Sequence, residues 1–413
     1  MSRGTSSRKA LGQWYTPLWL VNAVLDLVGQ PPRKVLDPAC GDGRWLAEAH
    51  RRWPDAKLEG WDLDPSAIAA ARASGVPATF TVRDALSGEE RNIADLVVGN
   101  PPYVRPQHLD AKTRAHVWGG RFKTATDKCD LYAPFTERMM ELGPRVFIVL
   151  ADTWLSMTSF SAMRDHVDPH IDLLLDLPAG TFDEALVGTV VLTTEGHRRQ
   201  RGELGRGGLS KLRPLERTDG VFPKTAAPAL PGTTTLADHW RLRMGVVCGS
   251  YAEWVHSGPV GPHDRRTCRG RDIQRFSIAD RGELVRYQPR EMLNRRPYVA
   301  PKTAELFDVA EKVVLSGASG KTLRVAVDTE RRFPLDSCYI SQGDGDVWAL
   351  CGLLNSSVVS AWYGARFPAI RVKAVELARL PWPSGSLTPL AEAARAADQA
   401  GVDAAAAKAY GLT

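Results

Sequence analysis

The sequence lacks the features that mark several common classes of protein. No apolar run in its 413 residues approaches the roughly 18 that a membrane-spanning helix needs. The first nine residues, Met1 to Lys9, are polar and basic and contain no apolar core of a secretory signal. We therefore expect a cytoplasmic chain in which residues 1–11 form a disordered tail.

Cysteine is scarce and follows no pattern. The six cysteines lie at positions 40, 129, 248, 268, 338 and 351, with no C-x-x-C pair and no Cys/His cluster of zinc spacing. Such isolated cysteines are typical of reduced thiols in a cytosolic protein. The sequence therefore predicts no bound metal.

Charge is distributed unevenly along the chain, whose net charge is +6. Residues 1–196 contain 21 Lys and Arg against 25 Asp and Glu, a net charge of −4. Residues 197–413 contain 32 against 22, a net charge of +10. A basic C-terminal half indicates a polyanionic partner such as nucleic acid, although a solvated basic surface without a partner is an alternative.

The N-terminal half alternates between short apolar runs and helical segments. We expect strands at 34–36, 58–62, 78–82, 95–98, 146–150, 171–175 and 187–193, with helices at 46–52 and 66–73. Short apolar strands separated by helices indicate a parallel α/β sheet that is covered on both faces. The length of the chain favours a second domain beyond this one.

The C-terminal half reads differently. Residues 197–217 carry seven Lys and Arg against two Glu, and residues 223–235 are rich in Pro, Thr and Ala, so we expect a basic linker over 197–235. Beyond it, the sequence predicts a smaller α+β domain over 236–413. Its expected strands are at 246–247, 323–327 and 337–341, and its expected helices at 304–315, 347–354 and 390–410.

The first chemical signal is the segment V-L-D-P-A-C-G-D-G at 35–43, in which a strand runs into a tight glycine turn and then a helix. Glycines allow the backbone to approach a ligand closely, and open α/β sheets bind ligands at the carboxyl ends of their strands. An acidic residue before two glycines suits a cationic ligand group better than a pyrophosphate. The expected ligand-binding residues are Asp37, Ala39, Cys40, Gly41 and Gly43.

Acidic residues also end the next two expected strands. Asp62 can accept hydrogen bonds from both hydroxyls of a ribose, and Asp84 can accept one from an adenine amino group. Each alone could cap a helix. Three acidic strand ends in succession favour a nucleoside cofactor with a cationic group.

The sharpest signal is N-P-P-Y at 100–103, which follows the apolar run 95–98. Pro101 and Pro102 fix φ and remove two N–H donors. The side-chain oxygen of Asn100 and the main-chain oxygen of Pro101 can accept both hydrogens of one planar NH2 group. They would thereby localise its lone pair toward a methyl donor for in-line transfer, by positioning and electrostatics. Tyr103 offers a face on which a base can stack.

With these motifs the chain resembles the gamma-class, Taq-type adenine-N6 DNA methyltransferases of restriction–modification systems. G-Q-W-Y-T-P at 12–17 is similar to the family's opening motif, 37–43 to its motif I and 100–103 to its motif IV. Asp130-Leu131-Tyr132 with Phe135, and residues 146–154, resemble the segments that follow. The resemblance covers most of the chain and includes the family's order of motifs.

The resemblance implies a Rossmann-like S-adenosyl-L-methionine methyltransferase domain over 12–196, in which Thr16 contacts the methionine end of the cofactor. It implies that the target adenine is flipped out of double-stranded DNA and held from its other face by a later aromatic residue, for which Phe182 is the candidate. The implied catalytic residues are Asn100, Pro101, Pro102, Tyr103 and Phe182. The implied cofactor-binding residues are Thr16, Asp37, Ala39, Cys40, Gly41, Gly43, Asp62, Asp84 and Asn100.

The C-terminal domain resembles the family's target-recognition domain. Residues 269–273, R-G-R-D-I, are similar to the element near its start, 353–356 to its L-N-S helix, and 409–413 to the tail of its longer members. Basic side chains of this domain can contact phosphates or guanine edges. The candidates are Arg269, Arg271, Arg295 and Arg296.

The sequence also departs from the family. The opening motif begins at Gly12, so we expect a cognate restriction endonuclease to be a separate protein, and the methyltransferase to be a monomer. Ala85 stands where some relatives place an aromatic residue against the cofactor's adenine. Alternatives are a glutamine-N5 protein methyltransferase, a guanine-N2 RNA methyltransferase, a cytosine-N4 DNA methyltransferase, or a non-catalytic DNA-binding subunit that retains the fold.

Overall fold

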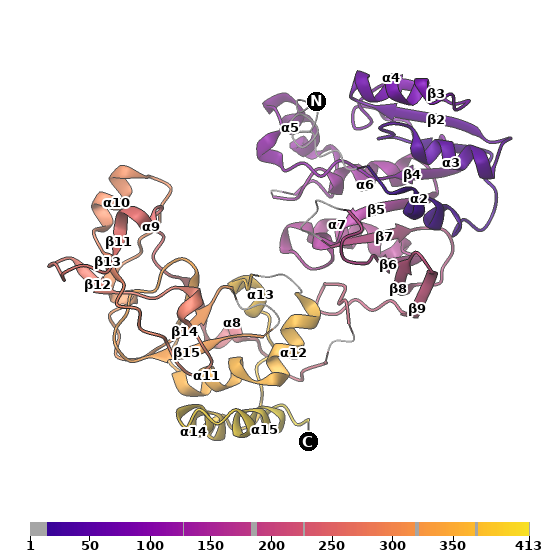
Figure 1. The fold of residues 1–413 in the computed structure, drawn as a ribbon. Helices are drawn as coiled ribbons and strands as arrows, with labels where there is room; N and C mark the ends of the chain where they lie inside the picture. The colour runs from indigo at the N-terminus through magenta and orange to yellow at the C-terminus, as the bar shows by residue number, and fades with distance from the viewer. Residues whose placement is uncertain are drawn as a thin grey trace. The chain divides into compact units, whose positions relative to one another are not determined.

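The computed structural model describes residues 15–126, 128–182, 188–225, 228–318, 322–367 and 371–412. The chain divides into two compact units, Met1–Phe222 (unit 1) and Pro223–Thr413 (unit 2), which are coloured from indigo to magenta and from rose to yellow in Figure 1. Unit 1 contains all the motifs expected to carry chemistry. Unit 2 corresponds to the expected recognition domain.

Unit 1 is built on a nine-stranded sheet of order β3-β2-β1-β4-β5-β7-β6-β8-β9 (Figure 1). Neighbouring strands from β3 to β5 are parallel, and β7 is antiparallel to both β5 and β6. The strands are β1 (Lys34–Asp37), β2 (Lys57–Asp62), β3 (Thr79–Val82), β4 (Leu96–Gly99), β5 (Arg145–Ala151), β6 (Leu173–Asp176), β7 (Thr189–Thr193), β8 (Gln200–Gly205) and β9 (Gly208–Pro214). The predicted mostly parallel α/β sheet is therefore confirmed.

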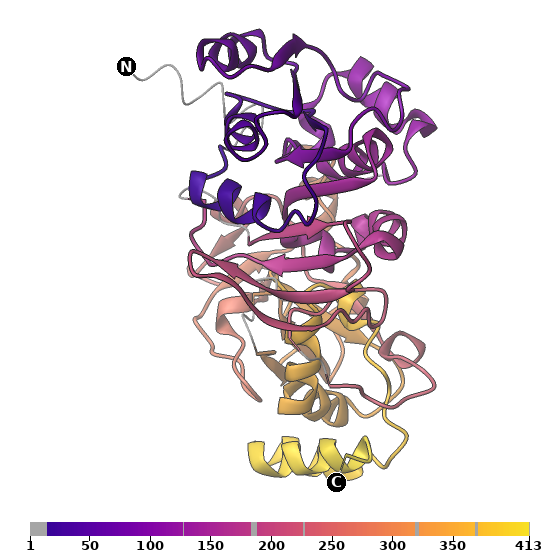
Figure 2. The same cartoon turned by 90° about the vertical axis from the view of Figure 1, so that its right-hand side faces the viewer.

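Helices cover both faces of this sheet, because successive strand residues point to opposite sides. In β4, Leu96 and Val98 join one buried cluster and Val97 joins the other. One face is covered by α2 (Leu18–Leu25), α3 (Arg44–Arg52) and α4 (Pro65–Ala73), and the other by α6 (Tyr132–Leu142) and α7 (Ser161–Val167). Figure 2 shows helices on either side of the strands.

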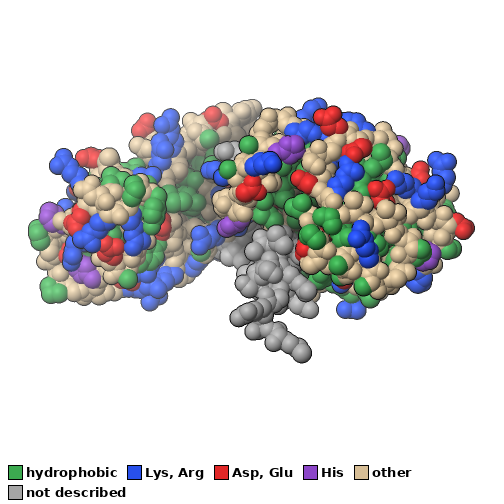
Figure 3. Space-filling model, turned by 90° about the horizontal axis from the view of Figure 1, so that it is seen from above, with side chains coloured by type: hydrophobic (Ala, Val, Ile, Leu, Met, Phe, Trp, Pro, Cys, Tyr) green, Lys and Arg blue, Asp and Glu red, His purple; other side chains and the backbone are tan. Residues whose placement is uncertain are grey.

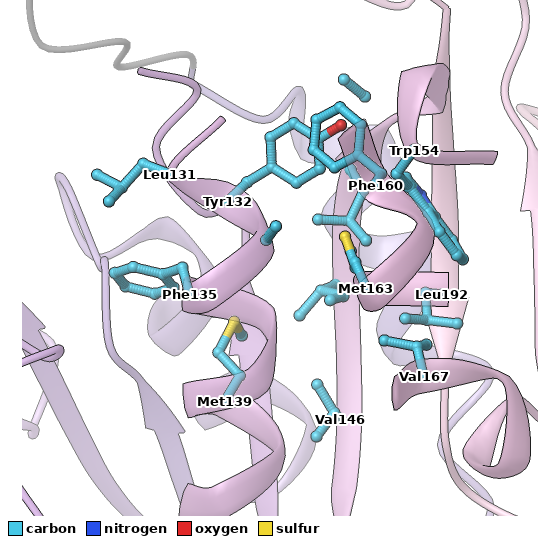
Figure 4. Packing of buried hydrophobic residues seen from close by; sticks show 14 of the residues in the cluster. Leu131, Tyr132, Phe135, Met139, Val146, Trp154, Phe160, Met163, Val167 and Leu192 are labelled. Atoms are coloured by element: carbon cyan, nitrogen blue, oxygen red, sulfur yellow. The ribbon is translucent and has the colours of Figure 1, made fainter. Parts of the chain in front are cut away.

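The cluster beneath α6 and α7 reaches up to the end of the sheet where the catalytic motif was expected. Tyr132 stacks on Phe160 with ring centroids 5.0 Å apart. Figure 4 shows both rings at the head of the cluster, above Met139 and Val146. Aromatic packing therefore fixes the start of α6, which follows the segment after N-P-P-Y.

The predicted linker over 197–235 is wrong for residues 197–222, which belong to unit 1. β8 pairs parallel with β6, and β9 pairs antiparallel with β8, so residues 200–214 form a hairpin that extends the sheet. Arg201 is 1% exposed, and its guanidinium donates to both carboxylate oxygens of Asp176 at 2.8 Å. The basic composition suggested an exposed linker, but the charge of Arg201 is buried against the carboxylate of Asp176 on β6.

Unit 2 is an α+β domain, as predicted. Its four-stranded sheet has the order β10-β16-β14-β15 and its three-stranded sheet the order β11-β13-β12. The strands are β10 (Arg241–Met244), β11 (Val255–His256), β12 (Asp264–Arg266), β13 (Leu284–Arg286), β14 (Lys312–Ser316), β15 (Val325–Asp328) and β16 (Cys338–Gln342). The helices are α8 (Leu236–His239), α9 (Tyr251–Trp254), α10 (Pro289–Arg295), α11 (Val347–Asn355), α12 (Ser357–Arg366), α13 (Ala374–Leu377), α14 (Thr388–Arg395) and α15 (Gln399–Ala409).

Two expected helices of unit 2 differ in the structure. Residues 304–315 form a short 3-10 turn, Ala304–Leu306, followed by strand β14, in which all five residues are buried. Lys312 reaches Asp328 on the neighbouring strand at 2.5 Å, a long-range ion pair that local sequence does not reveal. The expected helix over 390–410 is two helices, separated at Ala397, whose φ is 53°.

All six cysteines are buried free thiols. Within the described residues, no helix is long and apolar enough to cross a membrane. No group of three or more His, Cys, Asp or Glu side chains in those same residues could hold a metal ion.

Candidate active site

The topology brings the two chemical motifs together at one point of the sheet. From β1 the chain builds β2 and β3 on one side and then returns to place β4 on the other. The connections that leave β1 and β4 therefore diverge, and such a switch point is where open α/β sheets bind ligands. Asp37 ends β1, and Asn100 directly follows β4.

Gly99 shows how closely the two motifs approach. Its φ is 147°, and a Cβ atom there would lie 2.7 Å from Oδ1 of Asp37. Only glycine tolerates both this backbone conformation and this distance. The sequence predicted both motifs separately, and the structure places them in contact.

Asp37 is fully buried and incompletely paired. Its Oδ1 accepts a hydrogen bond from the Ala39 amide at 3.1 Å, while its Oδ2 has no hydrogen-bond partner in the described part of the chain. Burial raises the pKa of Asp37, and the nearby carboxylates of Asp62 and Asp42 raise it further. A cationic group placed against Oδ2 would stabilise the ionised carboxylate.

Asp62 holds the glycine turn in place. Its Oδ2 accepts from the Gly41 amide at 2.9 Å and its Oδ1 accepts from the Asp64 amide at 2.9 Å. Gly41 and Gly43 have φ values of 53° and 82°, as the turn into α3 requires. Burial raises the pKa of Asp62, and the two backbone donors oppose this. Each carboxylate oxygen can accept a second hydrogen bond, so a ligand hydroxyl can still bind.

Ala39 and Cys40 complete this turn. The Cys40 amide donates to the carbonyl of Trp61 at 2.8 Å, which ties the turn to β2. The Cys40 thiol is buried, and burial raises its pKa, so the side chain is a neutral packing group. Ala39 contributes the amide that binds Asp37.

Asp84 begins a loop that is held in place by hydrogen bonds from Arg138 on α6. Oδ1 of Asp84 accepts from the Leu86 amide at 2.9 Å. Arg138, whose side chain is 0% exposed, donates to the carbonyls of Ala85 at 2.9 Å and Glu90 at 2.6 Å. The sequence analysis missed Arg138; its position on an otherwise buried face of α6 is the signal that could have revealed it.

The opening motif lies beside the glycine turn. Thr16 is 2% exposed, and its carbonyl accepts from Arg44 Nη1 at 2.7 Å. Arg44 also binds Asp42 through Nε at 2.9 Å and Nη2 at 2.6 Å, and its guanidinium lies 4.6 Å from the centre of the Tyr15 ring. Tyr15 and Arg44 were not predicted as site residues. Residues 12–14 of the motif lie outside the described residues.

The N-P-P-Y turn is internally hydrogen bonded. Tyr103 Oη donates to Oδ1 of Asn100 at 2.6 Å and lies 3.0 Å from the carbonyl of Val149. A hydroxyl has one proton, so these two acceptors compete for it. Burial raises the pKa of Tyr103, which keeps the hydroxyl protonated as a donor.

The ring of Tyr103 is half-buried and meets Tyr132 edge to face, with centroids 5.6 Å apart. Pro101 is buried and Pro102 is half-buried. The turn is therefore held rigidly by the cluster that Figure 4 shows.

Phe182 lies in a different buried cluster from the one that Tyr103 packs against. It is 8% exposed and belongs to the cluster under α2 and α3, whereas Tyr103 packs against the cluster under α6 and α7. The contact of its ring with the target base stays a prediction. Residues 183–187, which follow it, lie outside the described residues.

The candidate DNA-binding arginines of unit 2 are already paired. Arg269 Nε and Arg271 Nη2 bind the two oxygens of Glu283 at 2.8 and 3.0 Å. Arg295 binds Glu253 and Glu291, each at 2.6 Å.

The fourth candidate, Arg296, donates to the carbonyl of Gly249 at 2.9 Å and lies 3.6 Å from a carboxylate oxygen of Glu253. Each of the four arginines thus has an internal partner that a DNA contact would have to replace or share.

Comparisons with known proteins agree with this architecture. The model of the Eco57I restriction-modification methylase family matches residues 59–181, and that of the TaqI-like C-terminal specificity domain matches residues 265–382. Type II methyltransferase M.PaeR7I of Pseudomonas aeruginosa is 27% identical over 289 residues, covering 57% of this chain and 50% of that protein. Type II methyltransferase M.TthHB8I of Thermus thermophilus is 34% identical over 176 residues, covering 39% of each.

The matched region thus spans half or less of the length of these relatives. Among solved structures, the DrdV–DNA complex has a TM-score of 0.61 at 12% identity, covering 96% of this chain and 58% of that one. A nuclease-deletion mutant of the Type ISP restriction-modification enzyme LlaGI has a TM-score of 0.58 at 9% identity, covering 94% and 55%. These two likenesses concern the fold alone. The chain thus contains a region that matches the Eco57I restriction-modification methylase family, followed by a region that matches the TaqI-like C-terminal specificity domain.

Proposed function

We propose that this chain is a site-specific DNA methyltransferase of a restriction–modification system that transfers a methyl group from S-adenosyl-L-methionine to N6 of adenine. The observation that carries the proposal is the contact between the Asp37 turn and the N-P-P-Y turn across Gly99. A cofactor site and an amine-binding turn that meet at the switch point suit direct transfer between two bound molecules.

The residues of the glycine turn fit the cofactor. S-adenosyl-L-methionine supplies an activated methyl group on a sulfonium centre. The orphaned Oδ2 of Asp37 would bind the cofactor's ammonium group, and Thr16 would contact its methionine end. Asp62 would accept from the ribose hydroxyls and Asp84 from the adenine amino group.

At the N-P-P-Y turn, two acceptors would bind the target amine. The Asn100 carboxamide oxygen and the Pro101 carbonyl accept its two hydrogens, which directs the nitrogen lone pair toward the methyl donor. The Tyr103 hydroxyl has an alternative acceptor in the Val149 carbonyl at 3.0 Å. Rotation of this hydroxyl toward Val149 would let Asn100 accept from the amine, while the tyrosine ring packs against the flipped base.

The proposal extends to the partners of the enzyme. Unit 2 would bind double-stranded DNA, with Arg269, Arg271, Arg295 and Arg296 as its candidate contacts. Three of the relatives are named Type II methyltransferases, which supports DNA as the substrate. Light scattering of the purified protein alone and with a duplex would test the expectation of a monomer.

The decisive experiment gives the protein methyl-labelled cofactor with unmethylated genomic DNA, RNA or cell protein, followed by modification-sensitive sequencing of the DNA. We expect N6-methyladenine at one short motif with the wild type and none with Asn100→Ala. Asn22→Ala, on helix α2 and outside the proposed site, is the matched control and should retain activity. N4-methylcytosine, or label only in RNA or protein, would contradict the proposed substrate and leave the cofactor site intact.

A further inference from the structure

The segment between the N-P-P-Y turn and α6 presents a helix that unit 1 does not cover. Helix α5 (Ala111–His116) has no buried residue, and five of its six side chains are exposed. A helix this short is not stable on its own in water. Because α5 has no buried face, it must be held in place by the residues on either side of it, and its exposed side chains are available to an external partner.

The segment is anchored at both ends of this helix. Asp110 caps α5 through the Thr113 amide at 2.9 Å and the Thr113 hydroxyl at 2.6 Å. After the helix, Val117 and Phe122 are 1% and 3% exposed and join the core. The indole of Trp118 donates to the Thr126 carbonyl at 3.0 Å. The residues on either side of α5 are thus fixed to unit 1, while α5 itself is exposed to solvent.

The charge of this segment is opposite to that of its surroundings. Residues 104–128 contain six Lys and Arg against two Asp, a net charge of +4, although residues 1–196 as a whole carry −4. The other residues of that range therefore carry −8. In the view from above, Lys, Arg and His side chains gather at the end of unit 1 where Figure 1 places α5 (Figure 3).

The exposed cations of α5 are not engaged by other side chains of the described residues. Lys112 and Arg114 are exposed, and neither side chain has a hydrogen bond or ion pair within the described residues. Arg105, at the start of the segment, is also exposed, and its charge opposes the rise that burial causes in the pKa of Asp130. By contrast, Arg121 at the base is tied to Glu141 at 3.0 Å.

The position of these cations relates them to the active site. The segment leaves the carboxyl end of β4 directly after Asn100–Tyr103, so its base shares the edge of the sheet at which a target base must arrive. Leu131, at the far end of the segment, donates to the carbonyl of Val104 at 2.8 Å and closes it into a loop at that edge.

From the exposure, the charge and this position, we infer that the α5 segment is a DNA-backbone contact of unit 1. Arg105, Lys112 and Arg114 bind phosphates of the duplex beside the flipped nucleotide. This inference rests on the proposed function and extends it, because it assigns part of the DNA affinity to the catalytic unit. Contacts of this kind are independent of base sequence and release counterions from the DNA.

The test compares DNA binding by the wild type and by the Lys112→Gln/Arg114→Gln variant of the whole chain over a range of salt concentrations. One duplex contains the motif that the protein methylates, and the other has a scrambled sequence. Each lost phosphate contact should reduce the steepness of the plot of log affinity against log salt concentration by about 0.9. We expect weaker binding to both duplexes in equal proportion, with cofactor affinity unchanged. Adding Arg105→Gln should flatten the plot further.

The matched control removes two positive charges at the amino ends of the strands, opposite the carboxyl ends at which the α5 segment begins. Arg33, whose side chain is 93% exposed, precedes β1, and the exposed Lys57 opens β2. Arg33→Gln/Lys57→Gln should keep the wild-type slope. The inference is overturned if the α5 variant keeps the wild-type slope or changes it no more than this control.

The outcomes separate the inference from the proposed function. Methylation at a motif together with an unchanged slope would reject the α5 contact alone. A flattened slope in a protein that transfers no methyl group would support the contact and reject the methyltransferase. A wild type that binds no DNA would reject both, and circular dichroism melting of each variant verifies that the fold is retained.

Discussion

At the scale of single residues, the paired and unpaired oxygens of the acidic strand ends distinguish their roles. Asp62 uses one oxygen to hold the glycine turn at Gly41 and the other to accept from the Asp64 amide, whereas Asp37 leaves one buried oxygen without a partner in the described ranges. A buried unpaired carboxylate is costly unless a ligand satisfies it. Replacing the Asp37 carboxylate should therefore weaken cofactor binding but remove a source of instability in the free protein.

Asp37→Asn should weaken cofactor binding strongly. Removing one member of a buried charge pair costs about 2–5 kcal/mol, which corresponds to roughly a 30-fold to several-thousand-fold loss of affinity. Isothermal titration calorimetry with S-adenosyl-L-methionine measures it. An unchanged dissociation constant would remove Asp37 from the cofactor site.

The same substitution should change how the stability of the free protein depends on pH. Burial raises the pKa of Asp37 above the ordinary value of 3.8, so the folded state holds its proton more tightly than the unfolded state does. The contribution of Asp37 to stability is therefore greatest at acidic pH and falls as pH rises from about 4 through the folded-state pKa. Urea denaturation should show a smaller loss of stability over this range in Asp37→Asn than in the wild type.

Tyr103→Phe tests the hydroxyl of the N-P-P-Y turn. The ring is retained, but the hydrogen bond to the Val149 carbonyl that would hold the turn in place while Asn100 binds the amine is lost, and a hydrogen bond of this kind contributes about 1 kcal/mol. We expect the single-turnover rate of methyl transfer to fall about fivefold, with DNA affinity little changed. Tyr103→Ala, which also removes the ring, should fall further; equal rates for the two variants would mean that the ring does not hold the base.

At the scale of elements, the strands of the sheet were predictable and the added hairpin was not. Strands β1, β4 and β5 are short apolar runs, a pattern visible in the chain itself. In β8 and β9 most side chains are polar, and pairing depends on β6, which is distant in sequence. The misassigned helix at 304–315 has the same cause, because β14 is fixed by its ion pair with β15.

The hairpin can be tested through its buried ion pair. Asp176→Ala should lower the free energy of unfolding by about 3 kcal/mol, because it leaves the guanidinium of Arg201 buried without its carboxylate; we take the lower end because Asp176 is 22% exposed. Glu203→Ala, which breaks the exposed pair with Lys211 in the same hairpin, should cost less than about 1 kcal/mol. Equal effects in chemical denaturation would contradict the assignment of the hairpin to the sheet.

At the scale of the whole molecule, we expect cations with and without an internal partner to contact DNA in different ways. Lys112 and Arg114 in unit 1 have no partners in the described residues, whereas Arg269 and Arg271 in unit 2 share Glu283. Unpaired cations favour non-specific attraction to phosphates. Arginines held by a carboxylate are pre-oriented, as sequence-selective contacts require.

We therefore expect Arg271→Gln to act on specificity. If Arg271, which is 56% exposed, reads a base, its loss should narrow the difference between specific and scrambled duplexes by about 1–3 kcal/mol. The Lys112→Gln/Arg114→Gln variant should leave that difference unchanged. Competition binding at one salt concentration measures both, and a uniform loss with Arg271→Gln would make it a phosphate contact.

The sequence by itself determined the class of the protein and the identity of its two chemical turns. Asp37, Gly41, Asn100 and Tyr103 lie in short motifs whose chemistry depends on neighbouring residues, and local sequence is enough to express it. Only the tertiary structure decided how these turns are placed and supported. It brings Gly99 close to Asp37, holds Ala85 through Arg138, and buries Phe182. These depend on residues far apart in the chain, and packing of the whole sheet sets them.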